Sequence, residues 1–151
     1  MIAHVRLCTI GFTQKSAERF FGLLRQSGIA RLIDTRLKPG GHLAGFANGR
    51  DLPFFLDRLA DGCRYEHLPR LAPTPEMLGD YRKDHDWNRY VARYETLMDE
   101  RGVPAALDRA EFARWPTCLL CSEATPDACH RRLVAERLAR AWGDVEIIHL
   151  V

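Results

Sequence analysis

The sequence contains no apolar run near the roughly 20 residues that a membrane-spanning helix needs, so we expect no membrane segment. Its first residues, MIAHVRLCTIGF, lack the hydrophobic stretch and the small-residue cleavage site of a signal peptide. Internal repeats and low-complexity tracts are also missing, which excludes solenoid and fibrous proteins. Together these absences predict a cytoplasmic protein with no membrane partner.

A strong excess of one charge is missing as well. The 22 Lys and Arg residues stand against 20 Asp and Glu residues, so the net charge of +2 does not by itself indicate a nucleic-acid-binding protein. The five cysteines are an odd number and lie mostly on predicted strands, which favours reduced thiols. With 46% hydrophobic and 28% charged residues, the 151-residue chain has the composition of one globular domain.

Short apolar segments alternate with amphipathic ones, a pattern typical of an α/β domain. The predicted strands cover residues 5–10, 31–35, 64–68, 116–121 and 145–150. We therefore predict a single α/β domain over residues 1–151, with a mainly parallel five-stranded sheet and helices on both faces. A helical insert at about residues 76–112 precedes the fourth strand, and we expect it to serve as a lid or as a partner surface, for example in a homodimer.

Ligands of such sheets bind beyond the carboxyl ends of the strands. The side chains expected at that edge are Gly11 after the first strand, Asp34 and Arg36 after the second, and Cys121 and Glu123 after the fourth. Asp34 and Arg36 either close their strand as an ion pair or contact a ligand. Residues 38–50, which carry four glycines and Phe46, form a loop of a length that is often functional.

The most informative stretch is WPTCLLCSEATPDACHRRLVAERLARA, which reads as a buried strand, a polar turn and an amphipathic helix. Thr125 is a natural N-cap and Pro126 suits the first helical position, so the helix is predicted to begin near Pro126. In that phase His130 and Arg131 lie on the apolar face that packs on the sheet. Cys129 is rotated away from this face, which makes its access to the pocket less direct.

Cys121 ends a strand and faces a helix N-terminus, where the thiolate form is stabilised. This position favours a nucleophilic or redox cysteine. The alternative is a small apolar residue that completes a buried strand, which is our interpretation of Cys8 and Cys118.

The spacing of Cys118, Cys121, Cys129 and His130 resembles a zinc-ligand pattern. Residues three apart on a strand point to opposite faces, however, so Cys118 and Cys121 are not expected to share a metal. We assign no metal ligand on this basis. This objection does not apply to a site for a single metal ion formed by Cys121, Cys129 and His130, because it does not include Cys118.

His130 and Arg131 could hold an anion at the helix N-terminus, where backbone N–H groups and the helix dipole favour negative charge. Alternatively, Arg131 pairs with Glu123 or Asp34, and His130 bonds a carbonyl, so that both only fix the turn. The turn is not a phosphatase loop, because Asp127 stands where that chemistry needs an arginine. It also lacks the glycines and the lysine of a P-loop.

Five motifs in the same order as in a known family resemble the domain of unknown function 488. They are T-I-G at residues 9–11, D-T-R at 34–36, Phe46, Y-x-H-L-P at 65–69 and C-x-E-x5-C-H-R at 121–131. The resemblance implies the same fold and a site at these motifs, but no reaction and no cofactor. The chain departs from the family pattern at residues 12–13, which are Phe-Thr where many relatives carry His-Ser, and at 71–73, which are Leu-Ala-Pro in place of Leu-Gly-Gly.

These observations predict a protein that binds an anionic small molecule or a nucleotide-like group at the strand carboxyl ends, with a thiol-dependent reaction if it is an enzyme. The expected catalytic set is Cys121, His130, Glu123 and Asp34. The expected ligand-binding set is Gly11, Arg36, Phe46, Cys129 and Arg131. Two alternatives stay open: a nucleic-acid-binding or processing module that uses the arginine-rich helix and the glycine loop, and a non-enzymatic thiol or metal sensor.

Overall fold

Five parallel strands form a single sheet in the computed structural model, which describes residues 3–151 without the side chains at positions 42 and 43. The strands are β1 (Val5–Gly11), β2 (Arg31–Asp34), β3 (Arg64–His67), β4 (Thr117–Cys121) and β5 (Val145–Leu150). The α-helices of the described chain are α1 (Ala17–Gln26), α2 (Leu52–Leu59), α3 (Pro75–Asp84), α4 (Trp87–Glu100), α5 (Arg109–Arg114) and α6 (His130–Trp142). Two short 3-10 segments are η1 (His42–Ala47) and η2 (Pro69–Leu71).

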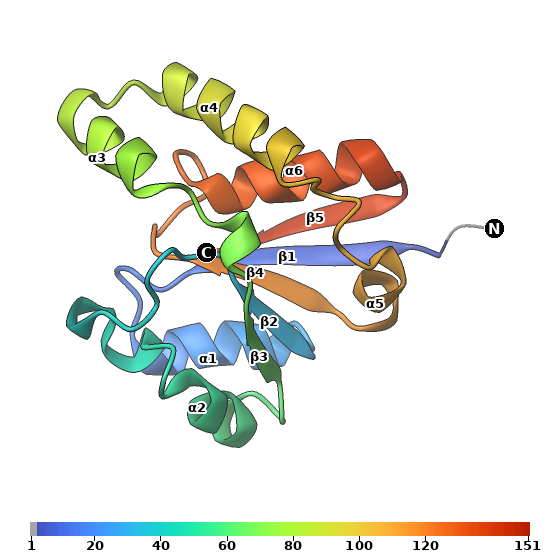
Figure 1. The fold of residues 1–151 in the computed structure, drawn as a ribbon. Coiled ribbons are helices and arrows are strands. Elements are labelled where there is room, and N and C mark those ends of the chain that lie inside the picture. The colour runs from blue at the N-terminus through green and yellow to red at the C-terminus, as the bar shows by residue number, and fades with distance from the viewer. Residues whose placement is uncertain (1–2) are drawn as a thin grey trace.

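The strand order across the sheet is β3-β2-β4-β1-β5, and helices cover both faces (Figure 1). The predicted fold class is thereby confirmed. Helices α1 and α2 pack on one face through an apolar cluster that includes Phe20, Leu24, Leu52 and Leu56. None of the helices among the described residues combines the length and the apolar content that a membrane-spanning segment needs.

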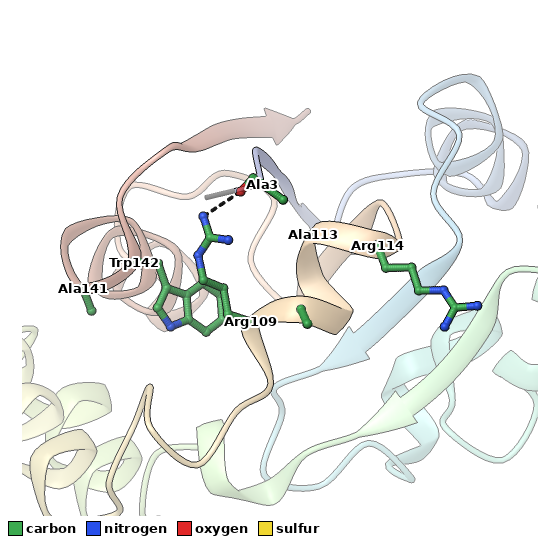
Figure 2. Close-up of a pocket in the computed structure, with 7 residues that line it drawn as sticks. Ala3, Arg109, Ala113, Arg114, Ala141 and Trp142 are labelled. Atoms are coloured by element: carbon green, nitrogen blue, oxygen red, sulfur yellow. Dashed lines mark hydrogen bonds between the residues drawn. The ribbon is translucent and has the colours of Figure 1, made fainter. Parts of the chain in front are cut away.

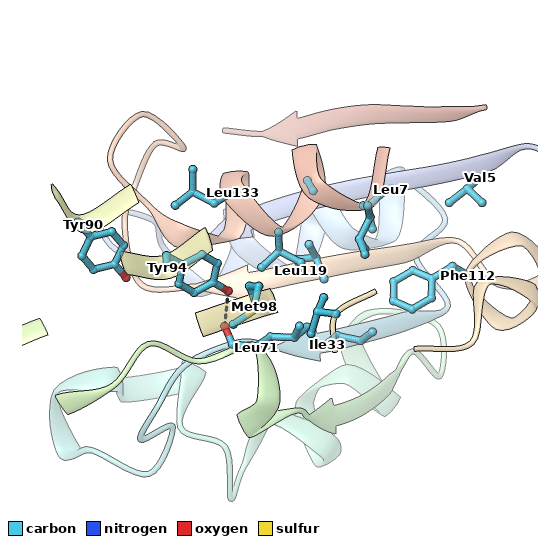
Figure 3. Close-up of a cluster of buried hydrophobic side chains, with 14 of the residues drawn as sticks. Val5, Leu7, Ile33, Leu71, Tyr90, Tyr94, Met98, Phe112, Leu119 and Leu133 are labelled. Carbon is cyan, nitrogen blue, oxygen red and sulfur yellow. Dashed lines mark hydrogen bonds between the residues drawn. The ribbon is translucent and has the colours of Figure 1, made fainter. Parts of the chain in front are cut away.

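The other face is covered by α6 together with the insert helices α3 and α4 (Figure 1). Its cluster joins Leu7 and Leu119 of the sheet to Tyr94 and Met98 of α4 (Figure 3). The Tyr94 hydroxyl is buried and donates a hydrogen bond of 2.6 Å to the carbonyl of Leu71, so a polar group in the cluster is satisfied. The insert is therefore part of the core on this side of the sheet.

Side chains of β4 alternate between the two clusters, as the pleat of a strand requires. Cys118 and Leu120 belong to the cluster under α1 and α2, whereas Leu119 belongs to the cluster under α4 and α6. Cys121 follows in phase with Leu119 and turns toward α6. The prediction that Cys118 and Cys121 point to opposite faces is confirmed.

The two central strands, β1 and β4, define where a ligand can enter. They pair in register with Gly11 opposite Cys121. The chain leaves β1 into α1 on one face and leaves β4 into α6 on the other face. Neighbouring strands whose connections depart to opposite faces create a crevice at their carboxyl ends, which is the usual ligand position in such sheets.

Gly11 allows the turn after β4 to close over the end of β1. A Cβ atom at Gly11 would lie 1.5 Å from the carbonyl oxygen of Glu123 and 2.8 Å from Nη1 of Arg131. No side chain fits in that space, because the first of these neighbours is main chain. Glycine is therefore required here by packing and not by backbone conformation.

Helix α6 begins at His130, four residues later than Pro126, where the sequence predicts its start. Cys129 occupies the N-cap position with an extended backbone (φ −137°, ψ 136°). The Thr125 hydroxyl donates to the Asp127 carboxylate at 3.3 Å and does not cap the helix. The prediction is wrong here because the turn after β4 packs against the end of β1. The chain can begin a helix only after this turn is complete.

Gly11→Ala should destabilise the fold by about 1–3 kcal/mol or more, the usual cost of overpacking a closed site. Gly22→Ala is the matched control, because nothing lies within 4 Å of a Cβ at that position inside α1. It should stabilise the protein by about 0.5–1 kcal/mol through helix propensity. Denaturant unfolding measures both values, and equal effects of the two substitutions would contradict the packing role of Gly11.

Candidate functional site

A cavity of about 880 Å³ opens at the carboxyl ends of β1, β2 and β4, beside α3 and the start of α4. From the sheet side and its turns it is lined by Phe12, Arg36, Lys38, Cys121, Glu123, Cys129 and His130. From the insert it is lined by Tyr81, Arg82, His85, Trp87 and Tyr90. The cavity lies at the crevice that the strand order creates.

Cys121 and His130 form a buried pair in this lining, with 6% of each residue exposed. The Cys121 sulfur lies 3.5 Å from Nδ1 of His130. Nε2 of the same ring lies 2.9 Å from the carbonyl oxygen of Thr35, which can only accept, so Nε2 must carry the hydrogen. The sulfur is also 3.8 Å from Nε2, so it faces the ring between the two nitrogens, and the ring would have to turn before its Nδ1 lone pair could take the thiol proton.

The Cys129 thiol lies in the same corner, with its sulfur within 4.8 Å of the Cys121 sulfur and of a His130 ring nitrogen. By donating a hydrogen bond toward Cys121, it lowers the pKa of the Cys121 thiol, and the Ser122 main-chain N–H and the Arg131 charge act in the same direction against burial. Burial raises the pKa of Cys129 well above its usual range. The first proton of the pair is therefore lost from Cys121.

Arg131 is fully buried behind this corner and does not line the cavity. Its guanidinium donates to the carbonyl of Glu123 at 2.7 Å, to the hydroxyl of Thr9 at 3.3 Å and to the sulfur of Cys129 at 3.5 Å. It pairs with the main chain of Glu123 and not with a carboxylate. Arg131 thus fixes the turn and supplies a positive charge beside the two sulfur atoms.

The expected pair of Asp34 and Arg36 is present as a buried ion pair. Nη2 of Arg36 lies 2.7 Å from Asp34 Oδ2, and Nε lies 2.9 Å from Oδ1. The Tyr65 hydroxyl donates to the same carboxylate at 2.7 Å, and Arg36 also donates to the carbonyl of Ala47. Arg36 therefore reaches the cavity as a neutralised and rigidly held cation.

Five of the nine residues that the sequence singles out line the cavity. These are Cys121, His130, Glu123, Arg36 and Cys129. Cys129 joins them although the predicted helix phase turned it away, because its backbone is extended and not helical. Glu123 is exposed, so its side chain is free to meet solvent or a ligand at the cavity wall.

The other four residues support the cavity from outside. Gly11 makes room for the turn, Asp34 holds Arg36, and Arg131 is buried behind the thiols. Phe46 packs against the rings of Phe20 and Phe21, at centroid distances of 5.3 and 5.7 Å, on the opposite face of the sheet. The structure therefore assigns these four residues to positioning and packing.

Sequence reasoning predicted that the insert is a lid or a partner surface but did not single out the insert residues that line the cavity. Arg82 and His85 are exposed on or just after α3, and no local pattern distinguishes them from any other solvated residues. The aromatic side chains of α4 pack in or against the core: Trp87 and Tyr90 stack at 5.1 Å, and Tyr90 and Tyr94 at 6.3 Å. These rings cover one another's faces and give the cavity an apolar edge.

The basic surface predicted for α6 is largely neutralised. Arg137 pairs with Glu95 at 2.7 Å and with Asp99, Arg132 pairs with Glu136 at 3.4 Å, and Arg140 reaches Glu95 at 3.5 Å. Glu95 and Asp99 belong to α4. Arg137 and Arg140 therefore connect α6 to the insert.

A second hollow of about 690 Å³ lies at the opposite edge of the sheet, near the start of β1 (Figure 2). It is bounded by Arg109, Trp142 and several alanines, and Arg109 donates a hydrogen bond of 2.7 Å to the carbonyl of Ala3. Its described lining contains no thiol, imidazole or carboxylate. The groups capable of chemistry thus belong to the cavity at the carboxyl edge.

A comparison with known protein families identifies the family of the chain. A family model, the domain of unknown function DUF488, matches residues 16–138. The chain belongs to the DUF488 family. No curated protein and no solved structure matches it. The DUF488 match spans the cavity residues from Arg36 to His130 and begins after Gly11, so the interpretation of β1 rests on the packing described above.

Cys121 should be alkylated by iodoacetamide at least about tenfold faster than Cys118 near neutral pH, in reduced protein treated with a chelator. The lowered pKa of Cys121 keeps its thiolate populated to lower pH than in an ordinary cysteine, and the rate should fall only as the pH drops through that value. Burial raises the pKa of Cys118 and keeps it protonated. Peptide mapping by mass spectrometry assigns each rate, and a fast phase that survives in Cys121→Ser would contradict the assignment.

Proposed function

We propose that this DUF488 protein binds an anionic small molecule in the cavity and carries out a thiol-dependent reaction at its Cys121–His130 end. The observation that carries the proposal is the combination of cations around the cavity with a thiol–imidazole pair in its buried lining. Phosphorylated and carboxylated metabolites are the ligand classes that such a charge pattern suits.

The charges around the cavity support an anion. Among its described lining residues, Arg36, Lys38 and Arg82 are cationic, and Glu123 alone is acidic. Asp34 already neutralises Arg36, whereas Lys38 and Arg82 are exposed on different elements, the loop after β2 and helix α3. An anion between these elements would meet two cations and would replace water at both.

The Cys121–His130 end supports chemistry in addition to binding. The imidazole is held by Thr35 and lies 3.5 Å from the thiol at Nδ1, so the two groups are in contact range. Both residues are buried beside the positive end of α6, where negative charge on sulfur is favoured. The protein groups that would act on a bound ligand are thus side by side, and a turn of the ring would bring Nδ1 onto the thiol.

A small ligand fits this arrangement better than a nucleic acid. The arginines of α6 that would contact phosphates are engaged with Glu95, Asp99 and Glu136, or buried in the case of Arg131. Binding a duplex through them would require these pairs to break. Lys38 and Arg82, in contrast, both line one cavity.

Arg82→Ala should weaken anion binding about tenfold, which corresponds to about 1.4 kcal/mol and is in the range of one charge-assisted hydrogen bond. Lys83→Ala is the matched control, because Lys83 neighbours Arg82 on α3 and does not line the cavity. Inorganic phosphate, pyrophosphate and a nucleoside monophosphate serve as probes, measured by thermal shift and calorimetry on metal-free protein. Absence of binding by every probe, or equal losses in the two variants, would contradict the proposed ligand class.

A further inference from the structure

We propose that Cys121, Cys129 and His130 form a three-ligand site for a thiophilic divalent metal of the zinc class, with its open coordination position toward the cavity. Among the residues that the structure describes, these three donors are buried and lie within 4.8 Å of one another. The inference rests on the same cavity and the same anionic ligand class as the proposed function, and it gives the thiols another role there: they hold a metal that the anion would meet, in place of reacting as free thiols.

The distances agree with zinc coordination. Bonds of about 2.3 Å to sulfur and 2.0–2.1 Å to nitrogen at tetrahedral angles place the two donor atoms roughly 3.5 Å apart. Cys121 Sγ and His130 Nδ1 are 3.5 Å apart. The same geometry needs roughly 3.8 Å between the sulfur atoms, so Cys129 has to approach by at most about 1 Å from its place within 4.8 Å.

One ring nitrogen of the histidine is held as in many metal ligands. Its Nε2–H is directed at the Thr35 carbonyl at 2.9 Å, which leaves Nδ1 as the nitrogen that can bind a metal. Ligating histidines commonly donate their second ring N–H to a carbonyl or a carboxylate, which fixes the tautomer. The Cys121 sulfur lies 3.5 Å from Nδ1 and 3.8 Å from Nε2, so the ring has to tilt for its Nδ1 lone pair to meet a metal that the sulfur atoms hold.

The charges also balance. Two thiolates neutralise a divalent ion, and Arg131 donates to the Cys129 sulfur at 3.5 Å, so the guanidinium stabilises the thiolate form of that ligand. All three donors line the cavity, which leaves a fourth position for water or for an anion held by Lys38 and Arg82. Sites with three protein ligands and one open position are typical of catalytic zinc, whereas structural zinc is fully enclosed by four.

The test measures metal binding without any anion. Full-length protein, reduced and treated with chelator, is titrated with Co²⁺, and the bound Co²⁺ is then displaced by Zn²⁺. We expect one ion per chain, a tetrahedral Co²⁺ spectrum with sulfur-to-cobalt charge-transfer bands, and loss of stoichiometric binding in Cys121→Ser, Cys129→Ser and His130→Gln. Cys118→Ala is the matched control, since its thiol lies on the opposite face of the sheet, and it should bind as the wild type does.

Absence of stoichiometric binding by the wild type would overturn the inference, as would equal binding in all variants. If a ligand variant does not fold, the wild-type charge-transfer intensity decides, because it must correspond to two thiolates. If the protein does not bind the metal but still binds phosphate, this inference is wrong and the proposed function, with Cys121 as a free thiol, is retained. Metal binding without any anion binding would support this site and contradict the proposed ligand class.

Discussion

A fully buried guanidinium, that of Arg131, connects the two central strands at the edge where the cavity lies. It donates to β1 through Thr9, to the turn after β4 through Glu123, and to the sulfur of Cys129. The three described acceptors are a hydroxyl, a main-chain carbonyl and a thiol, which are uncharged in their ordinary forms. These acceptors therefore stabilise the positive charge as dipoles and not as a negative charge. A buried charge held in this way favours negative charge nearby, and the closest groups that can supply it are the two thiols.

The fold was predictable from the sequence because its signals are local. The alternation of short apolar strands with amphipathic helices predicted the parallel sheet, and the last strand, β5, has the predicted bounds. Asp86 is a local helix-start signal of the same kind, since it caps α4 with its carboxylate accepting from the N–H of Arg89. The period-2 rule also placed Cys118 and Cys121 on opposite faces. In each case the signal that predicts the element lies within or directly beside the residues that form it.

The missed features depend on contacts between distant segments. Thr125 and Pro126 are a typical local signal for the start of a helix. However, Arg131 holds the turn against the end of β1 through its hydrogen bond to the Glu123 carbonyl, and the turn fits there only because Gly11 has no side chain. The sequence cannot show that competition. Arg82 on α3 escaped notice for the same reason, since its place at the cavity depends on how α4 packs on α6.

The close approach at Gly11 also limits how the sequence can change in evolution. The glycine and the turn around Glu123 are far apart in the chain, but this path of the turn is acceptable only while residue 11 is glycine. A larger residue could take that position only after the turn had taken another path, and a first strand exchanged for one with a side chain there would clash at this point. The identity of residue 11 therefore depends on a turn that lies far from it in the sequence.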